Sequence, residues 1–181
     1  EAVLLDWLAE HAPATRALHA STAALRALRD RVQQLRPELS CDLGALRRES
    51  IRMALQQAGD PPQLAEPAFE VFLAERQRVD LFDDALPALQ YLSRRWPVVA
   101  LSNGNADVHQ MGLGHYFHAT VSAREAGVPK PDARIFHQAA QAAGVAPAQV
   151  LHVGDDATLD AQGALNAGMQ AVWINSANHP W

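Results

Sequence analysis

The sequence has one cysteine, one lysine and no long hydrophobic run. Because Cys41 has no second cysteine to pair with, an intrachain disulfide and a cysteine-based zinc cluster are both excluded. Sparse cysteine fits a reducing compartment, and without a signal-peptide pattern we expect the cytoplasm. No stretch approaches the length of a membrane-spanning helix, so no membrane is expected as a partner.

An excess of positive charge is also missing. The 181 residues include 15 Lys and Arg against 20 Asp and Glu, which gives a formal net charge of −5 with His neutral. A mildly acidic protein is a poor partner for nucleic acid or for an anionic membrane. Hydrophobic residues make up 49% of the chain, enough to bury a core in one domain or in a domain with a large insertion.

The first half of the chain, residues 1–80, has apolar residues at helical spacing throughout. One stripe consists of Leu18, Leu25, Leu28, Val32 and Leu35. Two further stripes run through residues 43–55 and 65–73, and residues 3–8 open the chain in the same way. These patterns predict a small antiparallel helical bundle.

The second half, residues 81–181, alternates between strand and helix. The expected strands are Pro97–Leu101, His118–Ser122, Val150–Val153 and Ala171–Ile174. The first is a continuous apolar run, typical of a strand that is buried on both faces, and the third is expected to be a second buried strand. Strands that alternate with helices predict an α/β fold with a doubly wound parallel sheet.

Ligands of such sheets bind beyond the carboxyl ends of the strands, where three polar groups fall. The first group is Ser102, Asn103 and Gly104, directly after a strand. A hydroxyl, an amide and a permissive glycine can hold a phosphate through side chains and backbone N–H groups. The same residue types also favour an ordinary strand-to-helix turn, and that alternative stays open.

The second group is Lys130, which lies between Pro129 and Pro131. The following proline disfavours the helical region for the lysine, so we expect it to be extended, just before a helix that opens at Pro131. This arrangement would place a fixed positive charge beside the positive end of a helix. The alternative is a surface lysine in a loop.

The third group is Asp155, Asp156 and Asp160, which follow the strand Val150–Val153. Mg²⁺ is usually held by one or two carboxylates together with substrate phosphate and water. Capping of the next helix would explain one of these acids, but not three. The group therefore predicts a magnesium site.

Together these residues resemble the haloacid dehalogenase superfamily. Residues 101–104, 130–136 and 152–164 are similar to its second, third and fourth motifs, and residues 152–173 are especially similar to its flavin mononucleotide phosphatase branch. The resemblance covers roughly Asp83 to the end and implies a Rossmann-like core. Residues 1–80 are similar to that family's α-helical cap in position and character.

The resemblance also implies roles for the polar residues. Ser102 and Asn103 would hold the transferring phosphoryl group, and Lys130 would neutralise its charge. Asp155 would bind magnesium with help from Asp156, and Asp160 would hold Lys130 or a metal-bound water. Which cap residue would read the substrate is a guess, for which we name the arginines Arg47, Arg48 and Arg52.

The family's first motif, Asp-x-Asp on the first strand, has no counterpart, because no two aspartates lie two residues apart. We therefore expect a core whose first strand and C-terminal end are missing from these residues. The predicted function is a magnesium-dependent phosphomonoester hydrolase with an aspartyl-phosphate intermediate. Its expected substrate is a small phosphorylated molecule, flavin mononucleotide or a riboflavin-pathway phosphate. The alternatives are an incomplete module that binds a phosphorylated ligand or a protein, and a metal-free haloacid dehalogenase.

Overall fold

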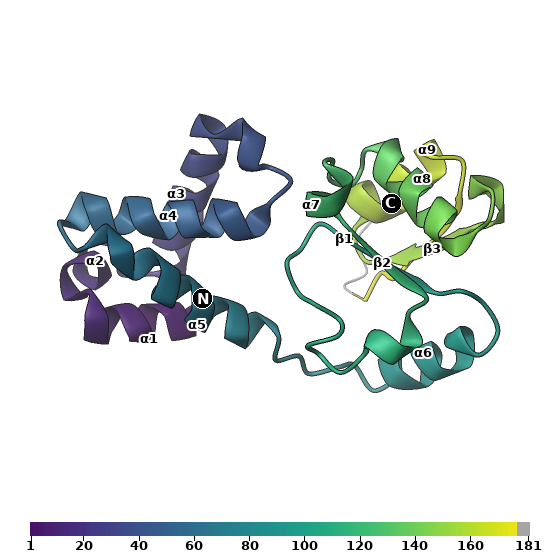
Figure 1. The fold of residues 1–181 in the computed structure, drawn as a ribbon, viewed down its shortest axis with the longest axis horizontal. Helices are drawn as coiled ribbons and strands as arrows, with labels where there is room; N and C mark the ends of the chain where they lie inside the picture. The colour runs from purple at the N-terminus through teal and green to yellow at the C-terminus, as the bar shows by residue number, and fades with distance from the viewer. Residues whose placement is uncertain (177–181) are drawn as a thin grey trace. The chain divides into compact units, whose positions relative to one another are not determined.

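The computed structural model describes residues 1–176, and the chain forms two compact units, residues 1–80 and residue 81 onward (Figure 1). The last residues of the second predicted domain, 177–181, lie outside the described part. Within residues 1–176, no helix is long and apolar enough to span a membrane. The first unit contains α1 (Ala2–His11), α2 (Pro13–Leu18), α3 (Thr22–Leu35), α4 (Leu43–Ala58) and α5 (Ala65–Arg76).

Local signals in the sequence place the ends of these helices. The side chain of Ser21 accepts a hydrogen bond from Ala24 N–H at the start of α3, and Asp42 does the same for Ala45 N–H at the start of α4. Gly59, with a φ of 81°, ends α4 in the left-handed conformation that glycine adopts readily. The first unit is therefore the helical bundle that the apolar spacing predicts.

The core of this bundle gathers the apolar stripes of α1, α3, α4 and α5. It includes Leu4, Leu8, Leu25, Ile51, Leu55, Ala68 and Phe69, which are all nearly inaccessible to solvent. Two residues that the apolar stripe predicts to be in this core are exposed instead: Leu18 is 56% exposed and Leu35 is 59% exposed. Both are the last residues of their helices, α2 and α3, where the chain turns away from the shared face.

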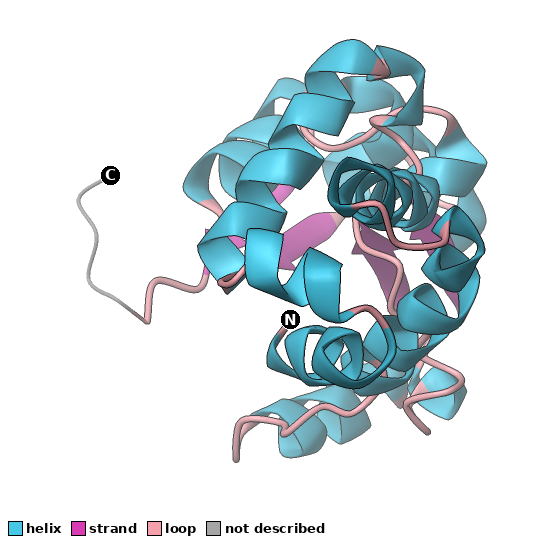
Figure 2. Ribbon diagram, turned by 90° about the vertical axis from the view of Figure 1, so that its left-hand side faces the viewer, coloured by secondary structure: helices cyan, strands magenta, loops and turns pink. Residues whose placement is uncertain are grey.

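The second unit has short strands between helices, and Figure 2 shows the strands in magenta and the helices in cyan. In chain order its elements are α6 (Ala85–Ser93), β1 (Val99–Ser102), β2 (Ala119–Ser122), α7 (Ala123–Ala126), α8 (Ala133–Ala143), β3 (Leu151–Gly154), a π-helical turn (Ala157–Gln162), α9 (Gly163–Asn166) and β4 (Gln170–Trp173). Short 3₁₀ turns occur at Pro37–Leu39, Pro62–Leu64, Gly114–Tyr116 and Pro147–Gln149.

All strand pairs in the described part of this unit are parallel. β1 pairs with β2 in the register that places Ser102 opposite Ser122, and β3 pairs with β4 so that Gly154 is opposite Trp173. Helix α8 packs on β1 and β2, and its Phe136 is fully buried in the core. Parallel strands covered by helices confirm the predicted α/β class with a Rossmann-like core.

The strand β3 was expected to be buried, but only one of its faces is covered within the described residues. Leu151 is 55% exposed and Val153 is 51% exposed, whereas His152 between them is partly buried. The exposure alternates because successive side chains of a strand point to opposite faces. Only the face that carries His152 is covered within residues 1–176.

Candidate functional site

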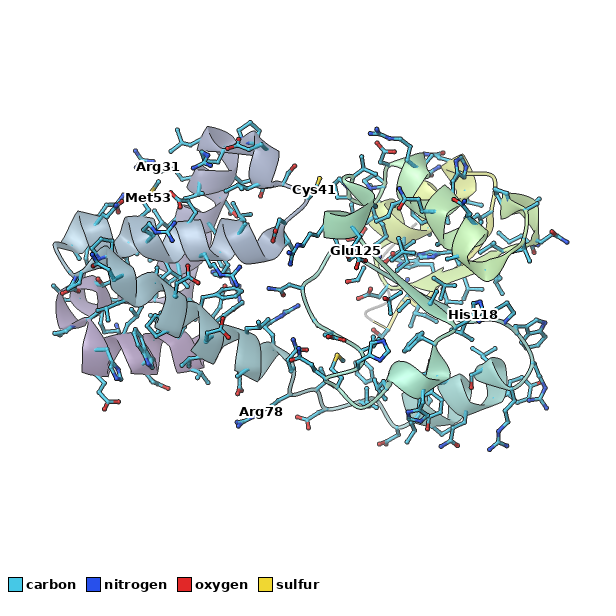
Figure 3. The ribbon with its side chains drawn as sticks, in the orientation of Figure 1. Arg31, Cys41, Met53, Arg78, His118 and Glu125 are labelled. Atoms are coloured by element: carbon cyan, nitrogen blue, oxygen red, sulfur yellow. The ribbon has the colours of Figure 1, made fainter. Side chains whose placement is uncertain are left out.

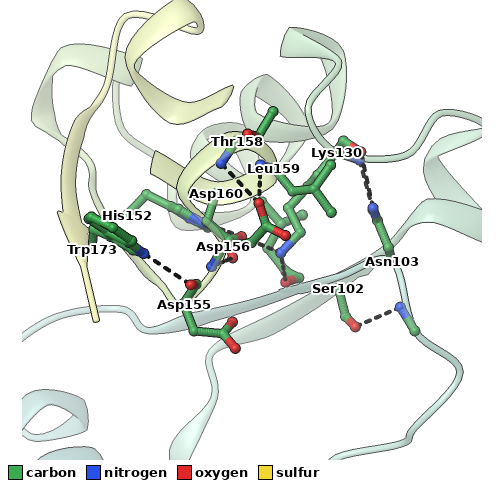
Figure 4. A network of polar contacts seen from close by, with 12 residues as sticks. Ser102, Asn103, Lys130, His152, Asp155, Asp156, Thr158, Leu159, Asp160 and Trp173 are labelled. Carbon is green, nitrogen blue, oxygen red and sulfur yellow. Dashed lines mark hydrogen bonds and ion pairs between the residues drawn. The ribbon is translucent and has the colours of Figure 1, made fainter. Parts of the chain in front are cut away.

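Lys130 links Asn103, which follows β1, to Asp160, which follows β3, in one network of polar contacts (Figure 4). Ser102 ends β1 and Gly154 ends β3, so the residues after them leave the carboxyl ends of two strands, each paired in parallel with its own neighbour. Lys130 comes from the segment between α7 and α8. Ligands of parallel α/β folds bind beyond such carboxyl ends of strands.

Asn103 holds the backbone of Lys130 at both of its polar groups. Its side-chain oxygen accepts a hydrogen bond from Lys130 N–H at 2.7 Å, and its amide nitrogen donates to the Lys130 carbonyl at 3.0 Å. The peptide bond that joins Lys130 to Pro131 is cis. Helix α8 begins two residues later than predicted, because Asp132 acts as its cap and accepts from Arg134 N–H. Lys130 is thus positioned by an amide side chain as well as by the start of a helix.

The ammonium group of Lys130 lies between two oxygen acceptors. Its Nζ is 2.5 Å from Asp160 Oδ1 and 3.4 Å from the Leu101 carbonyl oxygen on β1. The side chains of Lys130 and Asp160 are only 13% and 6% exposed. The alternative of a surface lysine in a loop is therefore wrong, since this lysine forms a buried ion pair.

Asp160 accepts three hydrogen bonds and is the centre of the network. Its Oδ1 accepts from Lys130 Nζ and contacts His152 Nε2 at 3.1 Å, while Oδ2 accepts from Asp156 N–H at 3.1 Å. Burial raises the pKa of Asp160, but the hydrogen bonds from His152, Lys130 and Asp156 together outweigh burial and lower the pKa far below its usual range. Asp160 is thus a buried, ionised carboxylate.

Gly154 allows Asp160 to approach the end of β3. A Cβ atom built on Gly154 would lie 2.3 Å from Asp160 Cγ, much closer than two carbon atoms can come. Any residue with a Cβ atom at position 154 would collide with the Asp160 side chain. Glycine is therefore required here for packing and not only for a turn.

The two neighbouring acids, Asp155 and Asp156, differ in what they contact. Asp156 Oδ1 accepts hydrogen bonds from Thr158 N–H at 2.9 Å and Leu159 N–H at 2.7 Å, which makes Asp156 the cap of the following helical turn. Asp155 is exposed, and its backbone carbonyl accepts from the indole of Trp173 at 3.0 Å. Its carboxylate has no contact drawn in Figure 4. Capping therefore accounts for Asp156, and Asp155 is the carboxylate available to a ligand.

Ser102 and Gly104 form a tight local turn. Ser102 Oγ accepts a hydrogen bond from Gly104 N–H at 2.9 Å, so this backbone donor is already used. A hydroxyl that accepts one hydrogen bond can still donate its own hydrogen to a ligand. At this position the structure favours Ser102 over Gly104 as a phosphate contact.

The site can accommodate magnesium only with ligands beyond its own side chains. Among residues 1–176 there is no cluster of three or more His, Cys, Asp or Glu side chains arranged to hold a metal ion. Mg²⁺ commonly keeps several waters and binds one or two carboxylates together with phosphate oxygens. Asp155, with the second oxygen of Asp156, matches that incomplete set.

His152 is a member of the network that the sequence interpretation did not single out. It lies on the covered face of β3, with its ring edge-on to Phe136 at a centroid distance of 5.1 Å. A polar side chain on the covered face of a strand needs a hydrogen-bond partner, and this signal could have identified His152. The carboxylate of Asp160 is that partner.

The three arginines considered for substrate recognition are engaged inside the helical unit. Arg47 is buried and pairs with Glu1 at 2.8 Å, while Arg48 pairs with Glu66 at 3.0 Å. Arg52 pairs with Glu49 at 2.6 Å. These contacts account for all three as structural ion pairs of the bundle.

The sequence matches a known protein family over most of its length. Residues 4–168 match the sequence model of a protein family that is described as haloacid dehalogenase-like hydrolase. The chain is 37% identical over 158 residues to 5-amino-6-(5-phospho-D-ribitylamino)uracil phosphatase YigB of Escherichia coli K12, covering 85% of this chain and 66% of that protein. It is also 37% identical over 143 residues to the phosphoserine phosphatase of Thermus thermophilus, covering 76% of this chain and 57% of that protein. The chain thus spans less than two thirds of either relative.

A solved structure gives the same family likeness in three dimensions. The 2-haloacid dehalogenase from Pseudomonas syringae pv. Tomato DC3000 superimposes with a TM-score of 0.89 at 37% identity, covering 99% of this chain and 79% of that one. The likeness therefore includes both compact units of the chain.

Proposed function

The chain belongs to the haloacid dehalogenase-like hydrolase family, and we propose that it is part of a magnesium-dependent phosphomonoester hydrolase. The observation that carries this proposal is the buried pair of Lys130 and Asp160 at the carboxyl end of β1. Asp160 fixes the position of the lysine side chain, in the region where Figure 4 also shows Ser102 and Asp155. A fixed positive charge beside a free carboxylate suits a phosphate and a magnesium ion together.

Five residues around Lys130 have defined tasks in this proposal, Lys130 included. The Lys130 ammonium binds a phosphoryl oxygen and offsets its negative charge, and the Ser102 hydroxyl donates to a second oxygen. Asn103 and Asp160 hold Lys130 in place. A magnesium ion bound at Asp155 would neutralise further phosphoryl charge. Electrostatic stabilisation of this kind dominates the catalysis of phosphoryl transfer.

The attacking carboxylate is assigned to no residue of this sequence. An aspartyl-phosphate mechanism needs an Asp-x-Asp pair, and that pair remains a prediction about sequence outside residues 1–181. In the described part, β1 and β3 each have one neighbouring strand, so each has one unpaired edge. Free edges beside the Lys130–Asp160 pair are consistent with a further strand that would bring the nucleophile to this site.

For the substrate we propose a phosphomonoester at the end of a ribityl chain. The Escherichia coli relative is named for such a compound, and flavin mononucleotide carries the same phosphorylated ribityl group. The Thermus thermophilus relative is named for phosphoserine, which is much smaller. A comparison of these three compounds therefore separates the two substrate classes.

The test uses the protein that the complete gene encodes. Release of phosphate from the three compounds is measured with Mg²⁺ and with a chelator. We expect faster release from the two ribityl phosphates, loss of activity on chelation and a loss of at least about 100-fold in Asp155→Asn. Asp30→Asn, which removes an exposed carboxylate of the helical unit, serves as the matched control. Activity that survives both chelation and Asp155→Asn would refute the proposed mechanism.

Hydrolysis of a carbon–halogen bond is the second candidate function, because the similar Pseudomonas syringae structure is named a 2-haloacid dehalogenase. The substrate of that reaction is an anion that binds without a metal. Two carboxylates, Asp155 and Asp156, would repel such an anion, which favours the phosphatase. Halide release from 2-chloropropionate in the presence of chelator would decide for the dehalogenase.

A further inference from the structure

A hollow lies in the second unit, at the opposite end of β1 and β2 from the candidate site. Its volume is about 470 Å³, within the range of small-molecule sites. Its walls come from residues 93–98, which lead into β1, and residues 115–118, which lead into β2. His118, labelled in Figure 3, donates its backbone N–H to the Val98 carbonyl at 2.7 Å, so the two walls are joined. The candidate site begins at Ser102, beyond the four residues of β1.

The lining of this hollow has an unusual charge for an acidic chain. It contains Arg94, Arg95, His115 and His118 but neither aspartate nor glutamate, although acids outnumber Lys and Arg by 20 to 15 in the sequence. Opposite charges nearby would normally neutralise such a group of basic side chains. Their absence from the lining makes the hollow attractive to an anion.

The two arginines differ in how they are engaged. Arg95 donates to the Tyr91 carbonyl at 2.9 Å, and its guanidinium lies 3.7 Å from the Tyr91 ring centroid, so it stabilises the end of α6. Arg94 is exposed, and its side chain has no hydrogen bond or ion pair within the described residues. The side chain of His118 likewise has none in this part of the chain. Arg94 and His118 are therefore available to a ligand.

Aromatic rings complete the lining. Trp96 is 57% exposed, and Tyr116 also lines the hollow, with its ring centroid 3.9 Å from that of His115. The Tyr116 hydroxyl accepts a hydrogen bond from Gln90 at 3.3 Å, which fixes one side of the ring. An exposed tryptophan beside an unpaired arginine offers a stacking face and a charge to the same molecule.

From this combination we propose that the hollow binds a small organic anion with a planar ring, of the nucleotide type. The ring lies against Trp96, and the anionic group is bound by Arg94 and His118. The site is separate from the phosphate site of the proposed function and does not depend on it.

The experiment follows the indole N–H resonances of the whole chain by NMR. Trp96 reports on the hollow, Trp173 reports on the candidate site through its contact with Asp155, and Trp7 reports on the helical unit. The Trp96 signal is assigned with Trp96→Phe. The probes are ADP, adenosine as the ring without the anion, and pyrophosphate as the anion without the ring.

ADP should shift the Trp96 resonance at concentrations at least tenfold lower than adenosine or pyrophosphate. Arg94→Gln should weaken this response at least fivefold, whereas Arg124→Gln, which removes an exposed arginine from α7, should leave it unchanged. The Trp7 and Trp173 signals of the Arg94 variant verify that it is folded. The proposal is overturned if millimolar ADP leaves Trp96 unshifted, if pyrophosphate alone acts as strongly as ADP, or if Arg94→Gln has no effect. A shift of Trp173 alone would place ADP in the candidate site and would equally refute it.

Discussion

Removing the charge of Asp160 should destabilise the second unit strongly. Asp160 has two oxygen atoms and three donors around it, from Lys130, His152 and the Asp156 backbone. In Asp160→Asn only one side-chain oxygen remains. It can accept hydrogen bonds either from Lys130 and His152 or from the Asp156 N–H, but not from both sides. The amide NH₂ then faces a donor on the other side, so at least one hydrogen bond is lost together with the charge.

The size of the effect follows from the burial of the pair. Removing one partner of a buried ion pair typically costs about 3–5 kcal/mol, because the other charge is left without compensation. Lys130 retains the Leu101 carbonyl at 3.4 Å and is 13% exposed, so we expect the lower end, about 3 kcal/mol. Lys130→Met should cost about 2 kcal/mol, since His152 and the Asp156 N–H still bind the carboxylate.

Urea unfolding monitored through Trp96 and Trp173 measures the free energy of unfolding of this unit. The double variant should lose about 2 kcal/mol less than the sum of the single variants, which is the coupling expected for groups in direct contact. Arg134→Gln, which breaks an exposed ion pair with Asp132, should change the stability little. If Asp160→Asn costs less than about 0.5 kcal/mol, or if the two substitutions are additive, the buried pair does not have the role described.

Three further predictions concern single positions. In Gly154→Ala the new methyl group must displace the Asp160 side chain, and we expect a loss of about 1–3 kcal/mol in urea unfolding together with loss of the proposed phosphatase activity. His19 is buried, its Nε2 has no hydrogen-bond partner within residues 1–176, and burial lowers its pKa. As the pH falls below about 6.5 the unfolded state takes up the proton first, so the helical unit should lose stability, and His19→Leu should flatten the pH dependence of unfolding monitored at Trp7. Ser21→Ala removes the cap of α3 and should cost that unit about 1 kcal/mol in the same measurement.

The sequence predicted the elements of the fold well where apolar periodicity determines them. Leu25, Leu28 and Val32 are buried at the expected helical spacing, and Gly144 ends α8 in the left-handed conformation. The prediction of buried residues failed where burial depends on contacts with other segments, which the periodicity of one segment does not reveal. Leu35 matches the stripe of α3 but lies at the end of the helix, beyond its neighbours.

The sequence-based prediction also failed for two helix caps. Ser122 and Glu125 form a reciprocal cap that begins the short helix α7, which was not predicted, although the spacing of serine and glutamate is a known signal. Which of two adjacent aspartates caps a helix is harder to read. Asp155 and Asp156 are equivalent by residue type, and only the direction of the backbone after β3 assigns the cap to Asp156.

The buried charged pair of the candidate site can do something that apolar side chains of the same volume cannot. A buried ion pair is often no more stable than apolar side chains of the same volume, so stability alone does not explain Lys130 and Asp160. The Lys130 ammonium has three hydrogens, of which one is directed at Asp160 and another at the Leu101 carbonyl. Two fixed acceptors determine the orientation of the third hydrogen, which remains for a ligand. A donor that is oriented before the ligand arrives needs no reorganisation when negative charge develops, and this is the property that phosphoryl transfer requires.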